Sequence, residues 1–217
     1  MNPVTLRVVS VNVALPKPLG EKDGETVLSA MAKRPVAAAT IAVGRVNLDG
    51  DAQANLEKHG GPDKAVYAYP SDHWQWWEKE HRYACSPGAF GENLTLLGAV
   101  ETDVHIGDRF SWGGTILEIS QPRVPCEKFT MYTGRDDAGA LMNLSARTGW
   151  YFRVTEESTA PVKDAALVRI SESGGPTVKE AFAAFFDPRF DRTRRLAMIK
   201  FPSLSEAWRI RLRARGD

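Results

Sequence analysis

The chain has 217 residues, of which 43% are hydrophobic and 25% are charged, and its formal net charge is +1. This composition is typical of a soluble globular protein, and the longest apolar runs fall far short of a membrane span. Two cysteines are too few for a disulfide scaffold, and no signal peptide opens the sequence, so we expect a cytoplasmic protein with both thiols free.

Many short strand patterns separated by turns fill residues 1–170. The sequence predicts strands at residues 5–13, 41–46, 65–69, 94–97, 103–106, 115–120, 151–154 and 166–170, with a hairpin turning at Gly113-Gly114. A helix is expected at residues 72–81 with Ser71 as its N-cap, and another at residues 136–147. Residues 16–25 read as a break followed by a turn. This pattern favours a mostly β (α+β) fold, a compact antiparallel β-barrel with peripheral helices.

The character of the sequence changes after a linker at residues 171–176. Capping-box patterns predict helices at residues 177–186 and 203–215, and a third helix is expected between them at residues 191–199. The chain is therefore expected to contain a barrel domain at residues 1–170 and a small three-helix C-terminal domain at residues 177–215. Residues 188–217 hold nine Lys/Arg and three Asp/Glu, which indicates either a nucleic-acid surface or solvated helix faces.

One cysteine stands in an unusual setting directly after the strand at residues 115–120. Cys126 lies in the segment Gln121–Lys128 directly after two prolines, Pro122 and Pro125, which end the sheet ladder and stiffen the chain. The cations Arg123 and Lys128 would favour its thiolate, the form that attacks electrophiles or binds soft metals. A buried, inert cysteine is the alternative, but this charged and proline-locked setting is a poor description of a core.

Two glycine-containing loops carry further candidate binding residues. In the first, Gly60 and Gly61 would let backbone N–H groups approach a ligand, while His59 and Lys64 would donate to a phosphate or an oxo group. An ordinary surface turn is the alternative for this loop. In the second, residues 88–94, two polar side chains enter a strand and would fix a polar ligand or satisfy a turn. They are Glu92 and Asn93.

Two further charges, Lys33 and Asp51, stand near predicted strand ends, where they would either face a site or remain plain surface charges. The spacing of the histidines and cysteines does not form a closed zinc site. No phosphate-binding loop of the P-loop type and no Rossmann fingerprint is present.

Together, four segments resemble the MOSC domain family, which is named after the C-terminal domain of molybdenum cofactor sulfurases. They are residues 59–67 (HGGPDKAVY), 88–94 (GAFGENL), 106–110 (IGDRF) and 121–128 (QPRVPCEK). Their order and spacing look like the stand-alone bacterial YiiM branch. The resemblance runs from about Val8 to Ile170, and the C-terminal segment looks like the small three-helix domain of that branch.

The resemblance implies a β-barrel that binds the molybdenum cofactor, a pyranopterin whose dithiolene and one protein thiolate hold the metal. By position, Cys126 matches the metal-ligating cysteine of the family, and a soft thiolate suits such a metal. Residues implied to bind the cofactor are Lys33, His59, Gly60, Gly61, Lys64, Glu92, Asn93, Arg123 and Lys128. Arg153 is a further candidate from its placement alone.

The leading functional hypothesis is an oxidoreductase that reduces N-hydroxylated compounds, such as 6-N-hydroxylaminopurine, to amines. An external reductase would supply electrons, and Asp51 or His59 would supply protons beside Cys126. A cofactor carrier without turnover is the alternative from another class, and a thiol hydrolase or transferase using Cys126 and His59 is a third. We do not expect nucleic-acid binding, because the turn between the last two predicted helices is Phe-Pro-Ser, without the glycine that such motifs often contain.

Overall fold

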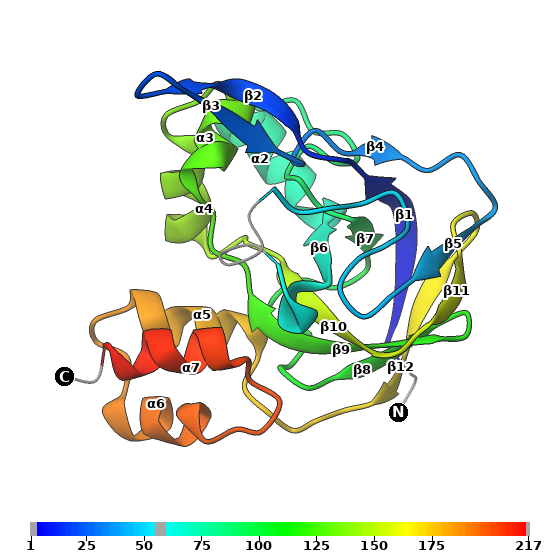
Figure 1. Ribbon diagram of the computed structural model, residues 1–217. Helices are drawn as coiled ribbons and strands as arrows, with labels where there is room; N and C mark the ends of the chain where they lie inside the picture. The colour runs from blue at the N-terminus through cyan, green and yellow to red at the C-terminus, as the bar shows by residue number, and fades with distance from the viewer. Residues whose placement is uncertain (1–3, 55–59, 216–217) are drawn as a thin grey trace.

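The computed structural model describes residues 4–54 and 60–215, in which seven strands close into a barrel (Figure 1). In spatial order they are β12 (Ala166–Ser171), β8 (Arg109–Trp112), β9 (Thr115–Pro122), β10 (Trp150–Glu156), β6 (Val66–Pro70), β7 (Leu94–Leu97) and β1 (Thr5–Val13). Pairing of β12 with β1 closes the circle. Neighbouring strands are antiparallel except β6 and β7, which run parallel. The predicted mostly β barrel with peripheral helices is confirmed.

Strand β6 shows how the barrel positions the site, because both of its faces are buried. Val66 and Ala68 point into the barrel core, and Tyr67 and Tyr69 point outward into a second hydrophobic cluster. Alternation along the strand therefore supplies two different environments from adjacent residues. The outer cluster, which also includes Trp77, Phe90 and Phe129, lies beneath the helices on that side of the barrel.

Those helices follow the strands closely in sequence. They are α2 (Trp74–His81), α3 (Glu127–Thr133) and α4 (Ala138–Ser145), with the short 3-10 turns η1 (Pro62–Lys64) and η2 (Ser71–His73) before β6 and α2. Ser71 does not cap a helix as expected. Its hydroxyl donates to the Leu96 carbonyl at 2.9 Å, and Ser71 is the first residue of η2, which precedes α2. Helix α3, which directly follows Cys126, was not predicted.

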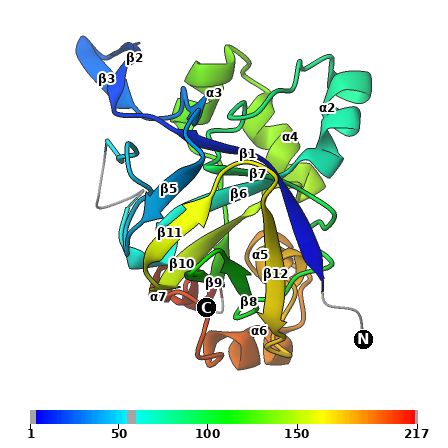
Figure 2. The same cartoon turned by 90° about the vertical axis from the view of Figure 1, so that its right-hand side faces the viewer.

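Additional strands extend the barrel on its outside. A hairpin of β2 (Lys17–Lys22) and β3 (Glu25–Ser29) projects from the barrel (Figure 2), β4 (Arg34–Pro35) pairs with β1, and β5 (Thr40–Val43) pairs with β11 (Ser158–Pro161). The segment at residues 16–25 was expected to be a turn, because most of its strand residues are polar and exposed and lack an apolar face. The strand predicted at residues 103–106 was wrong. This segment is a turn with one isolated bridge between His105 and Thr177.

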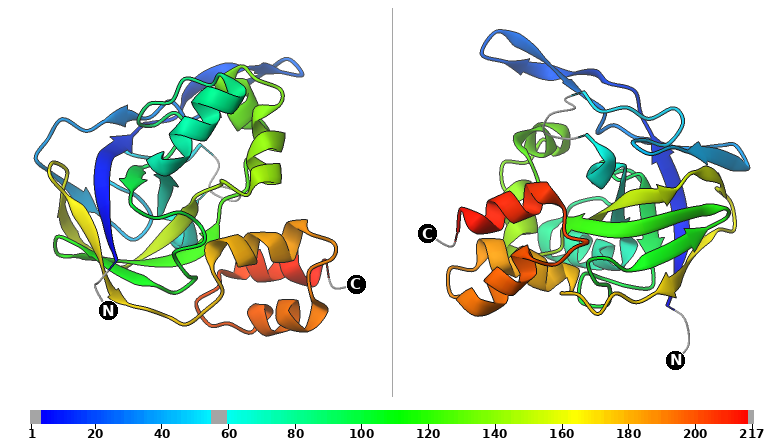
Figure 3. Two further views of the ribbon diagram at one scale, coloured as in Figure 1. Left: turned by 180° about the vertical axis from the view of Figure 1, so that it is seen from behind. Right: turned by 60° about the horizontal axis from the view of Figure 1, so that its bottom comes forward.

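The three C-terminal helices stack beside the barrel (Figure 3). They are α5 (Val178–Phe186), α6 (Arg192–Ile199) and α7 (Glu206–Arg213). Thr177 and Glu180 form the predicted capping box. Helix α7 is capped by Ser205 and not by Ser203, because the Ser205 hydroxyl accepts from the Trp208 N–H at 3.2 Å. None of the described helices has the length and apolarity needed to cross a membrane.

The helical unit and the barrel share one hydrophobic core. Phe182, Trp208 and Leu212 are fully or almost fully buried and belong to the same cluster as the interior residues of the barrel. The contact is also polar, since the Ser205 N–H donates to the Ser120 carbonyl at 3.0 Å. The helices therefore support the C-terminal end of β9, the strand that leads to Cys126.

Candidate functional site

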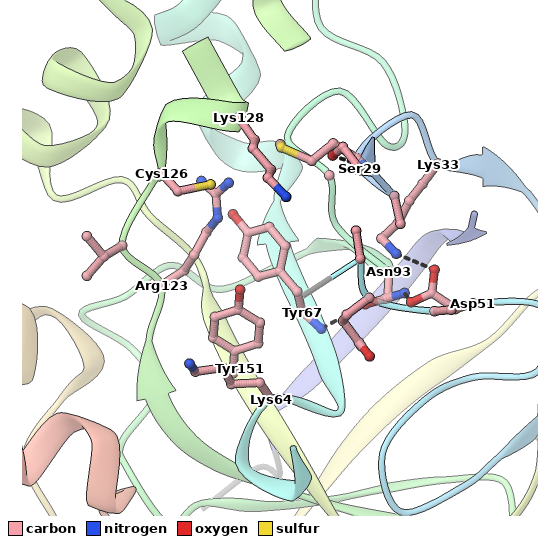
Figure 4. Close-up of a pocket in the computed structure, with 17 residues that line it drawn as sticks. Ser29, Lys33, Asp51, Lys64, Tyr67, Asn93, Arg123, Cys126, Lys128 and Tyr151 are labelled. Carbon is pink, nitrogen blue, oxygen red and sulfur yellow. Dashed lines mark hydrogen bonds and ion pairs between the residues drawn. The ribbon is translucent and has the colours of Figure 1, made fainter. Parts of the chain in front are cut away.

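A pocket opens where the end of β9, the start of α3 and several loops meet (Figure 4). Cys126, Arg123 and Lys128 lie on one side of it, Lys33, Asp51 and Asn93 lie on the other, and two tyrosines lie between them. Seven residues that the sequence marked as candidates line this pocket. They are Lys33, Asp51, Lys64, Asn93, Arg123, Cys126 and Lys128.

Cys126 owes its position to the rigid exit from β9. The strand makes its last pairing at Pro122, opposite Trp150, and Pro125 follows three residues later. Cys126 is extended, with φ −112° and ψ 171°, and it is the residue directly before α3. Its carbonyl accepts from the Phe129 N–H at 2.9 Å, and its half-buried side chain lines the pocket. The backbone on both sides of the thiol is therefore constrained.

Arg123 is a buried cation without a carboxylate partner among the described residues. Its side chain is enclosed, with 5% of the residue exposed, and its guanidinium carbon lies 4.9 Å from the ring centres of both Tyr67 and Phe129. Nη1 donates to the sulfur of Met142 at 3.0 Å. No carboxylate of the described residues forms an ion pair with it. Since buried charges are normally paired, this guanidinium favours an anion in the pocket.

Lys33, Asp51 and Asn93 form a fixed polar group on the opposite wall. Lys33 Nζ forms an ion pair with Asp51 Oδ1, and the two side chains are 8% and 1% exposed. Asp51 also accepts from the Ala14 N–H and from Asn93 Nδ2, both at 2.9 Å. Burial lowers the pKa of Lys33, although the negative charges of Asp51 and Glu92 oppose this shift. The Lys33 ammonium group is therefore held at the pocket wall with little exposure to water.

The loop at residues 88–93 holds the segment that carries Lys33. Gly88 and Gly91 have φ values of +82° and +75°, which glycine adopts without strain. A Cβ atom on Gly88 would lie 2.8 Å from the Lys33 carbonyl oxygen, and one on Gly91 would lie 2.9 Å from the terminal methyl of Met31. Only residues without a side chain permit this close approach, so the loop positions the wall of the pocket.

Glu92 was expected to bind the cofactor, but the structure turns its side chain into this loop. Its carboxylate accepts from the Gly88 and Phe90 N–H groups at 2.8 and 3.0 Å and from the Thr95 hydroxyl at 2.7 Å. Glu92 is completely buried and does not line the pocket, and burial raises the pKa of its carboxyl. It therefore holds the loop together, whereas its neighbour Asn93 reaches the pocket.

Lys64 and Lys128 add positive charge to the pocket wall. Lys128 Nζ donates to the Leu28 carbonyl at 2.8 Å, which also ties α3 to the β2–β3 hairpin. Lys64 ends η1, and burial and the nearby Arg211 lower its pKa. The described lining includes four cationic side chains and a single carboxylate, that of Asp51. The electrostatic balance of the pocket favours an anionic ligand.

Other candidates lie elsewhere. Gly60 and Gly61 are not among the lining residues, and His59 lies outside the described residues. Arg153 forms ion pairs with Asp63 at 2.8 Å and Glu118 at 2.7 Å, away from the pocket lining. Its position therefore indicates a structural role. No group of three or more His, Cys, Asp or Glu side chains within residues 4–54 and 60–215 could hold a metal ion.

Sequence reasoning missed two tyrosines that line the pocket. Tyr67 on β6 and Tyr151 on β10 are direct partners in the sheet, and their ring centres lie 5.2 Å apart. Burial raises the pKa of both phenols, so both remain neutral hydroxyls at physiological pH. In the sequence each resembles an ordinary aromatic residue of a strand. The pairing of β6 with β10 that brings them together is a long-range contact, which the sequence pattern does not show. The sequence held one indication that Tyr67 belongs to the site, which is its position shortly after the candidate binding loop at residues 59–64.

The comparisons with known proteins agree with this geometry. A family model described as the MOSC domain matches residues 55–168. An uncharacterized protein of Bacillus subtilis, YflK, is 36% identical over 97% of this chain and 94% of its own length. Protein YiiM of Escherichia coli is 34% identical over 75% of this chain and 74% of its own length.

Structural similarity extends over nearly the whole chain. The crystal structure of YiiM from Geobacillus stearothermophilus matches with a TM-score of 0.81 and 31% identity, covering 98% of this chain and 100% of that one. A Gibberella moniliformis protein named "Reductase" is 35% identical over 48% of this chain but only 19% of its own length. Family membership supports a function related to the molybdenum cofactor. The chain belongs to the MOSC domain family and is similar to its YiiM proteins in sequence and in structure.

Proposed function

We propose that this pocket binds the molybdenum cofactor and that the protein reduces N-hydroxylated compounds, such as 6-N-hydroxylaminopurine, to amines. The observation that carries the proposal is the buried Arg123, which has no carboxylate partner among the described residues and lines the same pocket as the Cys126 thiol. A cation prepared for an anion, next to a soft sulfur ligand, suits a cofactor with a phosphate group and a sulfur-bound metal.

The residues of the pocket fit this cofactor in their donor chemistry. Cys126 would provide the protein thiolate to the metal, and Arg123, Lys64 and Lys128 would hold anionic groups. Asn93 has both ends of its amide engaged, by the Tyr67 N–H at 3.1 Å, by Asp51 and by the Asn12 carbonyl at 3.2 Å. It would therefore act by orienting Asp51.

The proposed reaction consumes two electrons and two protons per N–O bond, and it yields an amine and water. When bound, the cofactor supplies the two-electron redox chemistry. The protein's contribution is to bind the substrate between charged walls, to exclude water with Tyr67 and Tyr151, and to deliver protons. We further propose an external reductase as the electron source. The name of the Gibberella relative supports an oxidoreductase assignment.

The test is expression in a host that makes the cofactor, followed by measurement of molybdenum and pterin per chain. The loaded protein should reduce 6-N-hydroxylaminopurine when a chemical electron donor is supplied. Cys126→Ser should abolish turnover. Cys85→Ser is the matched control, because Cys85 does not line the pocket, and it should retain activity.

Two outcomes would count against the proposal. Wild-type activity in the Cys126→Ser variant would remove the metal-ligand role. Stoichiometric cofactor without reduction, whatever the electron donor, would favour a carrier protein that hands the cofactor on. Absence of molybdenum and pterin from protein made in such a host would leave a thiol-based reaction at Cys126 as the better hypothesis.

A further inference from the structure

The wall of the pocket opposite Cys126 presents a buried lysine, Lys33, whose ammonium group has one hydrogen-bond acceptor among the described residues. We propose that Lys33 donates the proton that converts the departing hydroxyl of the substrate into water. This inference rests on the proposed reduction of N-hydroxylated compounds. It assigns Lys33, which the family resemblance placed among the cofactor-binding residues, to the chemical step.

The hydrogen bonds of Lys33 support this role. An ammonium group has three N–H donors, and the single acceptor of Lys33 Nζ within the described part of the chain is Asp51 Oδ1. The side chain is 8% exposed and lines the pocket. Its remaining donors are therefore available to a ligand in the pocket. Lys128 Nζ also has one acceptor among the described residues, the Leu28 carbonyl, but its side chain is only partly buried.

Asp51 was expected to supply protons, but its contacts make it an acceptor. Lys33 Nζ and the Ala14 N–H donate to one carboxylate oxygen, and Asn93 Nδ2 donates to the other. Each partner is a donor, so neither oxygen has the geometry of a hydroxyl that gives a proton to a ligand. Asp51 instead acts as a positioning residue that fixes the direction of the Lys33 ammonium group.

The chemistry of the substrate calls for such a donor. Hydroxide is a poor leaving group, and protonation of the oxygen as the N–O bond breaks allows water to leave. In the balanced step, two electrons come from the external reductant, one proton comes from Lys33 and one comes from solvent. The nitrogen becomes an amine and the oxygen becomes water. Lys33 then regains its proton from solvent.

The environment of Lys33 shifts its pKa in the direction that a proton donor requires. Burial lowers the pKa of Lys33, and the opposing acidic groups are Asp51 and Glu92. The cations Arg123, Lys64 and Lys128 line the same pocket. Because a general acid must be protonated, activity should fall as pH rises through the lowered pKa of Lys33.

The experiment uses three variants of the cofactor-loaded protein. They are Lys33→Met, Lys33→Arg and the double variant Lys33→Met/Asp51→Asn, which leaves no unpaired buried carboxylate if the single variant fails to fold. All three should keep molybdenum and pterin per chain within about twofold of wild type, while kcat falls about 100-fold or more, the usual contribution of a general acid. Arginine should not rescue kcat, because it keeps its proton. The matched control is Lys79→Met, an exposed lysine of α2, which should leave kcat unchanged.

A second substrate separates proton donation from positioning. An O-acylated hydroxylamine releases a carboxylate, which needs no proton to leave. With that substrate the Lys33→Met variant should lose less than about tenfold in kcat. The alkaline fall in the pH profile for the free N-hydroxy compound should also disappear in this variant.

Three results would overturn the inference about Lys33 alone. They are an unchanged kcat in Lys33→Met, an equal loss of kcat with both substrates, and a loss of molybdenum and pterin, which would make Lys33 a cofactor anchor. Failure of the wild-type protein to reduce either substrate when loaded with cofactor would instead remove the proposed function, and this inference with it.

Discussion

The hydroxyl of Ser205 donates a 2.6 Å hydrogen bond to Gln121 Oε1, and both side chains are buried. This bond joins the N-cap residue of the last helix to the strand end that continues into Arg123 and Cys126. The same serine caps α7 through the Trp208 N–H. One side chain thus begins a helix and attaches it to the strand that bears the site.

Replacement of Ser205 by alanine should destabilise the protein by about 2 kcal/mol. The change removes a helix cap and leaves the buried Gln121 oxygen without its donor. Chemical denaturation measures the effect. Ser203→Ala is the matched control, since Ser203 does not cap α7, and it should change the stability by less than about 0.5 kcal/mol. Equal effects of the two substitutions would contradict this account of the contact.

Arg123→Met should have opposite effects on stability and on cofactor content. The cofactor-free protein should become more stable, because a buried charge with no carboxylate partner in the described part of the chain is replaced by an apolar side chain of similar length. Cofactor content should fall about tenfold or more, since a charge-assisted contact to an anion is lost. Thermal denaturation and pterin analysis measure the two effects. A destabilised apo protein with full cofactor content would contradict the prediction.

Arg153→Met provides the contrasting case. Arg153 pairs with Glu118 and Asp63 outside the pocket, so its loss should cost about 2 kcal/mol of stability. The same denaturation and pterin measurements on this variant should show normal cofactor content per folded chain. Loss of cofactor without loss of stability would place Arg153 in the binding site after all.

The two cysteines should differ in their reaction with iodoacetamide. Burial raises the pKa of Cys85 to about 12, so its thiolate fraction at pH 8 is on the order of 10⁻⁴. Cys126 lines the pocket and should be alkylated first in the folded, cofactor-free protein, as peptide mass spectrometry can show. Cofactor loading should protect it. Faster modification of Cys85 would show that the two sites have been wrongly distinguished.

Glu92 should make the stability depend on pH in a defined direction. Burial raises its pKa above the unfolded value near 4.5, so the folded protein favours the protonated form. Its contribution is then fully present below pH 4.5 and declines as pH rises through the raised value. Glu92→Gln does not titrate at this position, so wild type should lose stability relative to this variant as pH rises above about 4.5. Denaturation across this range tests the sign, and a constant difference would contradict it.

The success of the fold prediction depended on local patterns. Strand alternation, the Gly113-Gly114 turn and the Thr177–Glu180 capping box are determined within a few residues, and the structure contains each of them. The β2–β3 hairpin was missed because its strands are polar, and it is held by contacts to α3 such as the 2.5 Å ion pair of Lys22 with Glu127. A segment that is stabilised by contacts to other parts of the chain has only a weak strand pattern in its own sequence.

The site was predicted in part for the same reason. Residues of one short motif, Arg123, Cys126 and Lys128, remain neighbours in the structure because the chain between them is short and constrained. Glu92 and Asn93 are adjacent in sequence, yet only Asn93 reaches the pocket. The N–H groups of the loop bind the Glu92 carboxylate and so turn that side chain away from the pocket. The motif alone does not reveal this.

The sequence by itself determined that one cysteine follows two prolines and lies between two cations at the end of a strand, because that setting is local. Only the tertiary structure decided that Arg123 lacks a carboxylate partner among the described residues, that Lys33 pairs with Asp51, and that Tyr67 lies beside Tyr151. These relationships join segments that are distant in the chain. They depend on closure of the barrel and on burial, which set the strength of every charge in the pocket.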